Sequence, residues 1–127
     1  MRLHESWLTK AQHDLASARM LFSGNNPILD VAVYHTEQCA EKALKAFLAF
    51  KKQPIMKTHD LSVLIDLCVD IDPDFNELYD SIENLNPYSI LYRYPGEIME
   101  PEKEEVLEAI ELSEKVFKFI ENKINQY

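Results

Sequence analysis

The stretch from Tyr34 to Phe50 places the strongest constraint on what this chain can fold into. It contains neither Gly nor Pro and is rich in Ala, Leu, Glu and Lys, which are strong helix formers. The breakers around it are Pro27 and Pro54, and the residue before a proline avoids the helical region. We therefore predict one long helix over residues 28–52 and an elongated bundle built around it.

This helix has an apolar arc and a polar flank when its residues are placed about 100° apart. The apolar arc comprises Val33, Ala40, Ala43, Leu44, Phe47 and Leu48. The polar flank, on the opposite side, comprises Tyr34, His35, Gln38, Glu41, Lys42 and Lys45. We predict that the helix is central and that its polar flank faces a partner or a ligand. The alternative is a solvated face with a Glu41–Lys45 ion pair.

The rest of the chain also shows helical spacing between helix-breaking segments. Residues 4–23 form a predicted helix that ends at Gly24. Further helices are predicted over 58–70 with Thr58 as N-cap, over 74–85, and from Pro101 onward. Residues 88–96 form an extended loop or a single turn. The predicted fold is all-α, an up-and-down bundle of four to five helices in a single domain spanning residues 1–127.

Composition excludes several classes of function. The net charge of −9 argues against non-specific nucleic-acid binding, which depends on neutralising phosphates. With only two glycines, the chain cannot form a Gly-rich phosphate loop or a dinucleotide fingerprint. His4 and His13 lie on opposite helix faces and no H-E-x-x-H occurs, so we expect neither a metal nor a cofactor. No membrane-spanning or signal segment is found, and two cysteines are too few for a disulfide framework, so a cytoplasmic location is expected.

Three short motifs, in order along the chain, give this sequence a family resemblance. They are residues 38–46 (QCAEKALKA), residues 57–61 (KTHDL) and residues 93–95 (RYP). Trp7 and Asp14-Leu15, which precede them, match the first helix of the same family. Together they resemble the HEPN family, the "higher eukaryotes and prokaryotes nucleotide-binding" domain, as a small stand-alone prokaryotic member. The resemblance implies a helical bundle that forms symmetric dimers with a cleft along the dimer face.

The resemblance also implies a function. Many members act beside a minimal nucleotidyltransferase in toxin–antitoxin-like pairs, and others are ribonucleases in which an Arg is followed four to six residues later by a His. Arg93 is followed by Tyr94, Pro95 and further residues up to Met99 without a His. The sequence therefore leans away from an enzyme and indicates no catalytic residue, although His59 could supply the missing group from another helix.

The candidate site follows from the polar flank and the matched motifs. We predict that the long helix turns its lysines and glutamine into one recess that also receives Arg93. Arg93 either binds a phosphate or forms a structural ion pair with Glu37 or Glu41. His59 is either a site residue or a helix cap. The candidate nucleotide- or phosphate-binding residues are Tyr34, Gln38, Glu41, Lys42, Lys45, His59, Arg93 and Tyr94.

Three functions remain open from the sequence. The first is a homodimeric, HEPN-like binding module that accepts a nucleotide and acts with a minimal nucleotidyltransferase. The second is a metal-independent ribonuclease with a displaced His. The third is a purely structural homodimer or adaptor, in which tyrosines such as Tyr34 and Tyr94 fill an interface.

Overall fold

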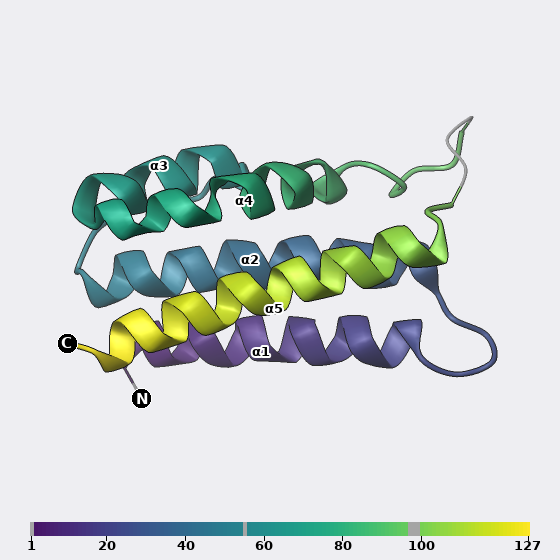
Figure 1. The fold of residues 1–127 in the computed structure, drawn as a ribbon, viewed down its shortest axis with the longest axis horizontal. Coiled ribbons are helices and arrows are strands. Elements are labelled where there is room, and N and C mark those ends of the chain that lie inside the picture. Colours follow the sequence, from purple (N-terminus) through teal and green to yellow (C-terminus); the bar gives the residue numbers. More distant parts are fainter. Residues whose placement is uncertain (1, 55, 97–99) are drawn as a thin grey trace.

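A computed structural model describes residues 2–54, 56–96 and 100–127, and every regular element in these ranges is helical. The predicted all-α bundle is therefore confirmed. In Figure 1, α1, α2 and α5 run along the long axis, α3 and α4 form a second layer, and the two termini lie at the same end. The elements are α1 (Leu3–Phe22), α2 (Leu29–Phe50), α3 (Leu61–Ile71), the 3-10 helix η1 (Pro73–Leu78), α4 (Tyr79–Leu85), the 3-10 helix η2 (Asn86–Ser89) and α5 (Lys103–Asn125).

Helix α2 is the central element, because it contacts α1, α3, α4, η2 and α5. Its apolar arc is fully buried or nearly so, as predicted. Phe47 of α2 packs against Phe75 of η1 with ring centroids 4.4 Å apart, and Phe75 meets Phe119 of α5 edge to face at 5.0 Å. These aromatic contacts join the two layers of the bundle into one core.

Several predicted helix ends differ from the observed ones. Asp60, and not Thr58, caps α3, since its carboxylate accepts a hydrogen bond from the Ser62 amide. The helix predicted over 74–85 is instead a 3-10 turn that begins at Pro73 and continues as α4. The loop predicted over 88–96 begins inside η2, and α5 begins at Lys103, two residues after the predicted Pro101.

The polar flank of α2 is not solvated over its whole length, which corrects the view of it as an open face. Glu41 is 3% exposed and Lys45 9% exposed, and Asp14 of α1 is buried beside them. Helix α1 packs along α2, and the segment before α3 returns to α2 so that His59 contacts Glu41. The middle of the flank is thereby enclosed between neighbouring elements.

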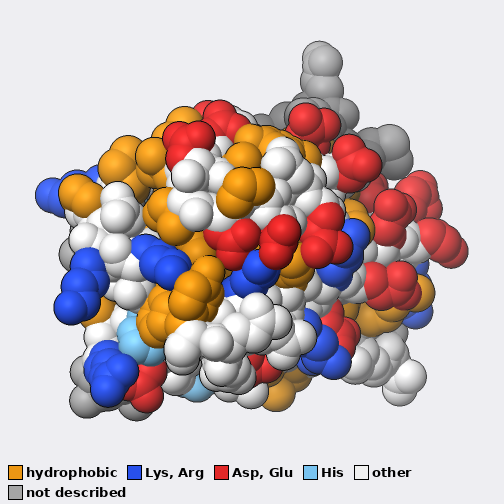
Figure 2. Space-filling model, turned by 60° about the vertical axis from the view of Figure 1, so that its left-hand side comes forward, with side chains coloured by type: hydrophobic (Ala, Val, Ile, Leu, Met, Phe, Trp, Pro, Cys, Tyr) orange, Lys and Arg blue, Asp and Glu red, His pale blue; other side chains and the backbone are white. Residues whose placement is uncertain are grey.

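Charged side chains of both signs are mixed on the surface. On the face shown in Figure 2, Lys and Arg side chains lie among acidic and hydrophobic ones instead of forming one continuous basic patch. Acidic side chains gather toward the right of that view. Within the ranges that the structure describes, no helix is both long and apolar enough to pass through a membrane.

Candidate functional site

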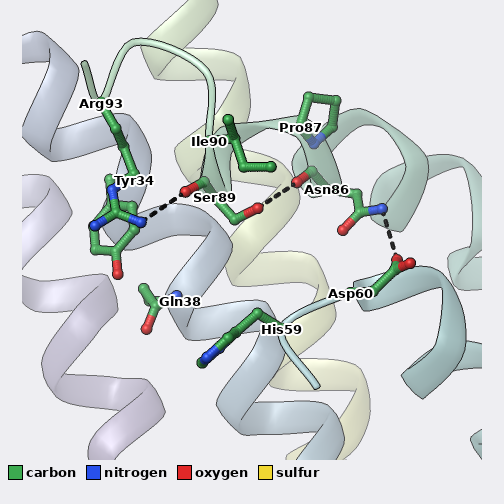
Figure 3. A pocket seen from close by; sticks show the side chains of 9 residues that line it. All are labelled: Tyr34, Gln38, His59, Asp60, Asn86, Pro87, Ser89, Ile90 and Arg93. Carbon is green, nitrogen blue, oxygen red and sulfur yellow. Dashed lines mark hydrogen bonds between the residues drawn. The ribbon is translucent and has the colours of Figure 1, made fainter. Parts of the chain in front are cut away.

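A cavity of about 510 Å³ lies between α2, the start of α3 and the segment from η2 to Arg93. We call it the recess. Figure 3 shows Arg93 and Tyr34 at one end and Asp60 and Asn86 at the other, with Gln38, His59, Ser89 and Ile90 between them. Its volume is within the range of small-molecule sites. It is lined by Tyr34, Gln38, His59, Asp60, Asn86, Pro87, Ser89, Ile90 and Arg93.

Arg93 is held at the recess by an aromatic ring and a backbone carbonyl. Its guanidinium carbon lies 4.9 Å from the centroid of the Tyr34 ring and 5.5 Å from that of Tyr94, and Nη1 donates to the Ser89 carbonyl at 3.2 Å. The predicted structural ion pair with Glu37 or Glu41 is wrong, because Glu41 contacts Lys45 and His59 and Glu37 accepts only from Gln38 among the described residues. Arg93 forms no ion pair with any residue that the structure describes.

The segment that carries Arg93 is anchored to α5 by a carboxylate. The hydroxyl groups of Tyr88 and Tyr92 both donate to Glu105, at 2.7 Å and 3.2 Å, and the two rings stack. Tyr92 has a φ of 68°, a left-handed conformation that is unfavourable for a residue with a side chain. Burial, followed by the Glu105 carboxylate, raises the pKa of Tyr88, which keeps its hydroxyl a donor. We call Tyr88, Tyr92 and Glu105 the clamp, and it fixes the backbone immediately before Arg93.

His59 is oriented by a buried carboxylate. Its Nδ1 lies 3.0 Å from Oε1 of Glu41, whereas three-quarters of its side chain is exposed. Because a carboxylate only accepts hydrogen bonds, Nδ1 carries the hydrogen and Nε2 of the neutral ring is an acceptor. The prediction that His59 caps α3 is wrong, since Asp60 fills that position.

The opposite end of the recess is formed by a locked pair of side chains. Oδ1 of Asp60 accepts from the Ser62 amide, the Ser62 hydroxyl and Nδ2 of Asn86, and Oδ1 of Asn86 accepts from the Leu61 amide. The Ser62 and Asn86 hydrogen bonds lower the pKa of Asp60. The sequence prediction did not include this pair. Asp-x-Ser before an apolar run signals an N-cap, but no sequence signal links Asp60 to Asn86.

The lysines of the α2 flank do not line the recess. Lys42 Nζ lies 2.6 Å from Oδ2 of Asp14, whose Oδ1 lies 2.7 Å from Nδ1 of His35. Lys45 Nζ lies 3.1 Å from Oε2 of Glu41 and 5.5 Å from the centroid of the Trp7 ring. The bundle therefore neutralises both lysines internally, contrary to the predicted recess that held them with Arg93.

The eight predicted site residues consequently occupy different places. Glu41 lies behind His59 and contacts it, and Tyr94 flanks Arg93 as an exposed side chain outside the recess lining. Lys42 belongs to a part-buried ion pair with Asp14, and Lys45 to a buried one with Glu41. The four that line the recess are Tyr34, Gln38, His59 and Arg93.

Glu37 is a fully buried carboxyl group beneath the recess residue Gln38. Gln38 Nε2 donates to its Oε1 at 2.8 Å, while Oε2 has no hydrogen-bond partner among the described residues. Burial raises the pKa of Glu37 to about 8, and the nearby carboxylates of Glu41 and Asp14 act in the same direction. Glu37 is therefore protonated at neutral pH, which explains why it needs no cationic partner.

The described residues contain no group of three or more His, Cys, Asp and Glu side chains placed to hold a metal ion. Cys39 and Cys68 are free and buried, and burial raises the pKa of Cys39 to about 12. Positions 97–99, which lie four to six residues after Arg93 where the ribonuclease motif has its histidine, are outside the described residues.

Comparisons with known proteins agree with this architecture. The sequence profile of the HEPN domain matches residues 4–123. The chain is 29% identical to the "Putative toxin MJ1304" of Methanocaldococcus jannaschii over 91% of its own length and 84% of that protein. The crystal structure of TT1696 from Thermus thermophilus is 27% identical, with a TM-score of 0.80 over 97% of this chain and 99% of that one. The structure of ST0689, an archaeal HEPN homologue, shares the fold at 24% identity and a TM-score of 0.74, covering 98% and 99% of the two chains.

Proposed function

This chain belongs to the HEPN domain family, and on that premise we propose that it is a binding module whose recess accepts the phosphate of a nucleotide. The observation that carries the proposal is the guanidinium of Arg93, stacked on Tyr34 at the mouth of a cavity of about 510 Å³. A guanidinium binds phosphate through paired N–H donors. Among the described residues, the Arg93 guanidinium has one hydrogen-bond acceptor, the Ser89 carbonyl.

The other recess residues complement such a ligand. The Gln38 side chain has used one N–H on Glu37, so its carbonyl oxygen and second N–H remain to bind a ligand. His59 adds an exposed ring that can donate to a phosphate when protonated. Pro87 and Ile90 provide an apolar wall against which a base can lie. Cationic, amide and apolar groups therefore converge on one cavity.

The partners belong to the same proposal. We place the protein as a homodimer that acts with a minimal nucleotidyltransferase in a toxin–antitoxin-like pair. Support comes from the family, from the name of the relative in Methanocaldococcus jannaschii, and from exposed aromatic and apolar side chains such as Tyr94 and Ile90 beside the recess. Aromatic side chains are enriched in protein interfaces.

Isothermal titration calorimetry with ATP, GTP and AMP tests the ligand. We expect binding to the wild type and an affinity at least about tenfold lower for Arg93→Ala, the loss of a charge-assisted contact. Arg19→Ala is the matched control, because it removes an arginine that pairs with Glu114 away from the recess. Absence of heat with every nucleotide, at concentrations up to the millimolar range, contradicts the ligand proposal.

Sedimentation velocity tests the assembly. We expect a dimer at micromolar concentration, and a larger species when a nucleotidyltransferase encoded in an adjacent reading frame is co-expressed. Tyr94→Ser combined with Ile90→Ser should shift the dimer toward monomer if this surface is the interface. A wild-type monomer at these concentrations contradicts the dimer.

A second function, ribonucleolytic cleavage, is favoured by the placement of His59. Its ring, with Nδ1 fixed by Glu41, lines the same cavity as Arg93. A neutral imidazole can act as general base through Nε2 while an arginine stabilises the charge that develops on phosphate. Single-stranded RNA should then be cleaved without added metal, and His59→Gln should abolish the cleavage. Cleavage that persists in His59→Gln contradicts this role.

A further inference from the structure

The recess has opposite charges at its two ends. Arg93 stands beside Tyr34 at one end, and Asp60 stands beside Asn86 at the other, as Figure 3 shows. A nucleotide phosphate is attracted to the guanidinium and repelled by the carboxylate. We therefore expect a nucleotide in the recess to lie along it, with its phosphate at Arg93 and its remaining part directed toward Asp60.

Asp60 is a fixed acceptor. Three hydrogen bonds saturate its Oδ1, two of them from Ser62 and one from Asn86. Its Oδ2 accepts no hydrogen bond from the part of the chain that the structure describes. An ionised carboxylate has no donor of its own. The group that meets Oδ2 must therefore supply an N–H or O–H.

We propose that Asp60 reads the base of the nucleotide and selects bases that carry an exocyclic amino group. This inference rests on the proposed function, because it assumes that a phosphate occupies the Arg93 end. In a nucleoside monophosphate the base edge is the part farthest from the phosphate, whereas the ribose hydroxyls lie nearer to it. Repulsion between phosphate and carboxylate thus favours the base edge at Asp60. Pro87, which lies beside Asn86, offers the apolar surface that a base needs there.

The preferred ligand class is accordingly nucleotides whose base presents an exocyclic amino group, as in adenine, cytosine or guanine, over those with a carbonyl or a hydrogen at that position. Asp and Glu accept from the exocyclic amino group of cytosine in nucleic-acid recognition for the same reason. A carbonyl in place of the amino group turns an acceptor toward Oδ2, so the hydrogen bond at that position is lost and two electron-rich oxygens face each other. Asp60 is a specificity residue in this arrangement, and Arg93 supplies the affinity.

Two pairs of ligands that differ in this group provide the test. Calorimetry of the wild type with AMP and inosine monophosphate, and with CMP and UMP, should show roughly fivefold tighter binding of the amino member in each pair, the gain from one hydrogen bond at a partly exposed site. In Asp60→Asn the preference should fall to about twofold or less, because an amide can donate as well as accept. Asn is also a good N-cap, so α3 should stay intact. Asp80→Asn is the charge-matched control, since Asp80 is exposed on α4 outside the recess, and should keep the wild-type preference.

The outcomes separate this inference from the function on which it rests. Equal affinity for both members of each pair overturns the role of Asp60 and leaves nucleotide binding intact. A preference for AMP over its 2′-deoxy form, without one over inosine monophosphate, shows that the ribose meets Asp60 and also overturns the inference. A base preference that survives in Asp60→Asn assigns the reading to another residue and overturns it as well. Absence of binding by all four nucleotides contradicts both proposals together.

Discussion

The lysines on the α2 flank form ion pairs with carboxylates, whereas the arginine at the recess forms none with the described residues. Lys42 and Lys45 are paired with Asp14 and Glu41 inside the bundle. Arg93 is stacked on Tyr34 and bonds to the Ser89 carbonyl. The first arrangement leaves no net charge to offer a ligand, whereas the second leaves guanidinium donors at a cavity. A cation in a sequence motif is thus available to a ligand only where the fold supplies no carboxylate to neutralise it.

Breaking the most deeply buried ion pair gives the largest expected effect. Lys45→Met leaves Glu41 buried without its lysine, and we expect the free energy of unfolding to fall by about 3 kcal/mol in urea titrations monitored by circular dichroism. Lys115→Met, on the exposed face of α5, is the matched control and should change stability by less than about 0.5 kcal/mol. Similar small losses for both variants would show that the α2 flank is solvated after all.

The pH dependence of the free energy of unfolding tests whether Glu37 is protonated in the folded protein. Its pKa is raised from an ordinary value of 4.5 to about 8 in the folded state, so folding favours the protonated form. The contribution of protonated Glu37 to the free energy of unfolding is fully present below pH 4.5. It is lost as the pH rises toward 8, because in that range the unfolded chain binds fewer protons than the folded one. We expect wild-type stability to decline relative to Glu37→Gln by about 2 kcal/mol between about pH 6 and pH 7.5, measured by urea unfolding. A pH-independent difference between the two proteins would contradict protonation of this group.

Removing Asp14 tests the other ion pair, whose partners reach solvent. Lys42 and His35 are 24% and 28% exposed, so both can turn toward water when the carboxylate is lost. Asp14→Ala should therefore lower the free energy of unfolding by only about 1 kcal/mol in the same urea assay. Asp80→Ala on α4 provides the exposed control. A loss as large as that of Lys45→Met would mean that Asp14 and Glu41 are equally enclosed.

The smallest expected change in stability is at the recess itself. Arg93→Ala removes an exposed side chain that forms no ion pair with the described residues, so we expect a change below about 0.5 kcal/mol in thermal and urea unfolding. This near-neutral effect, together with the loss of nucleotide affinity expected above, distinguishes a ligand-binding arginine from a structural one. Destabilisation comparable to that of Lys45→Met would instead assign Arg93 a structural role.

The sequence predicted local features more successfully than contacts between distant segments. The helix over 28–52 is observed as Leu29–Phe50, because Pro27, Pro54 and the intervening helix formers act within a few residues. The pairing of Lys42 with Asp14 depends on how α1 packs on α2, across 28 residues of sequence. The helical periodicity of α2 alone could not reveal that α1 covers its polar flank.

The recess also combines residues that the sequence predicted with contacts that it could not predict. Arg93 and Tyr34 stand out in the sequence as residues with suitable chemistry, but the stacking of one on the other depends on the Tyr88–Glu105–Tyr92 clamp and on the left-handed turn at Tyr92. Asp60 and Asn86 are not among the residues that the sequence predicts for the site. Their contact, across 26 residues, exists because α4 returns the chain to the start of α3.

The sequence by itself determined that the chain is helical, roughly where its long helices lie, and which family it resembles. Helix propensity, capping and the effect of proline act over one or two turns, so they can be read from neighbouring residues. The tertiary structure decided which charges are neutralised and which remain at a cavity. That outcome depends on distances of a few ångströms between residues far apart in the chain, because Coulomb attraction and desolvation change steeply over that range.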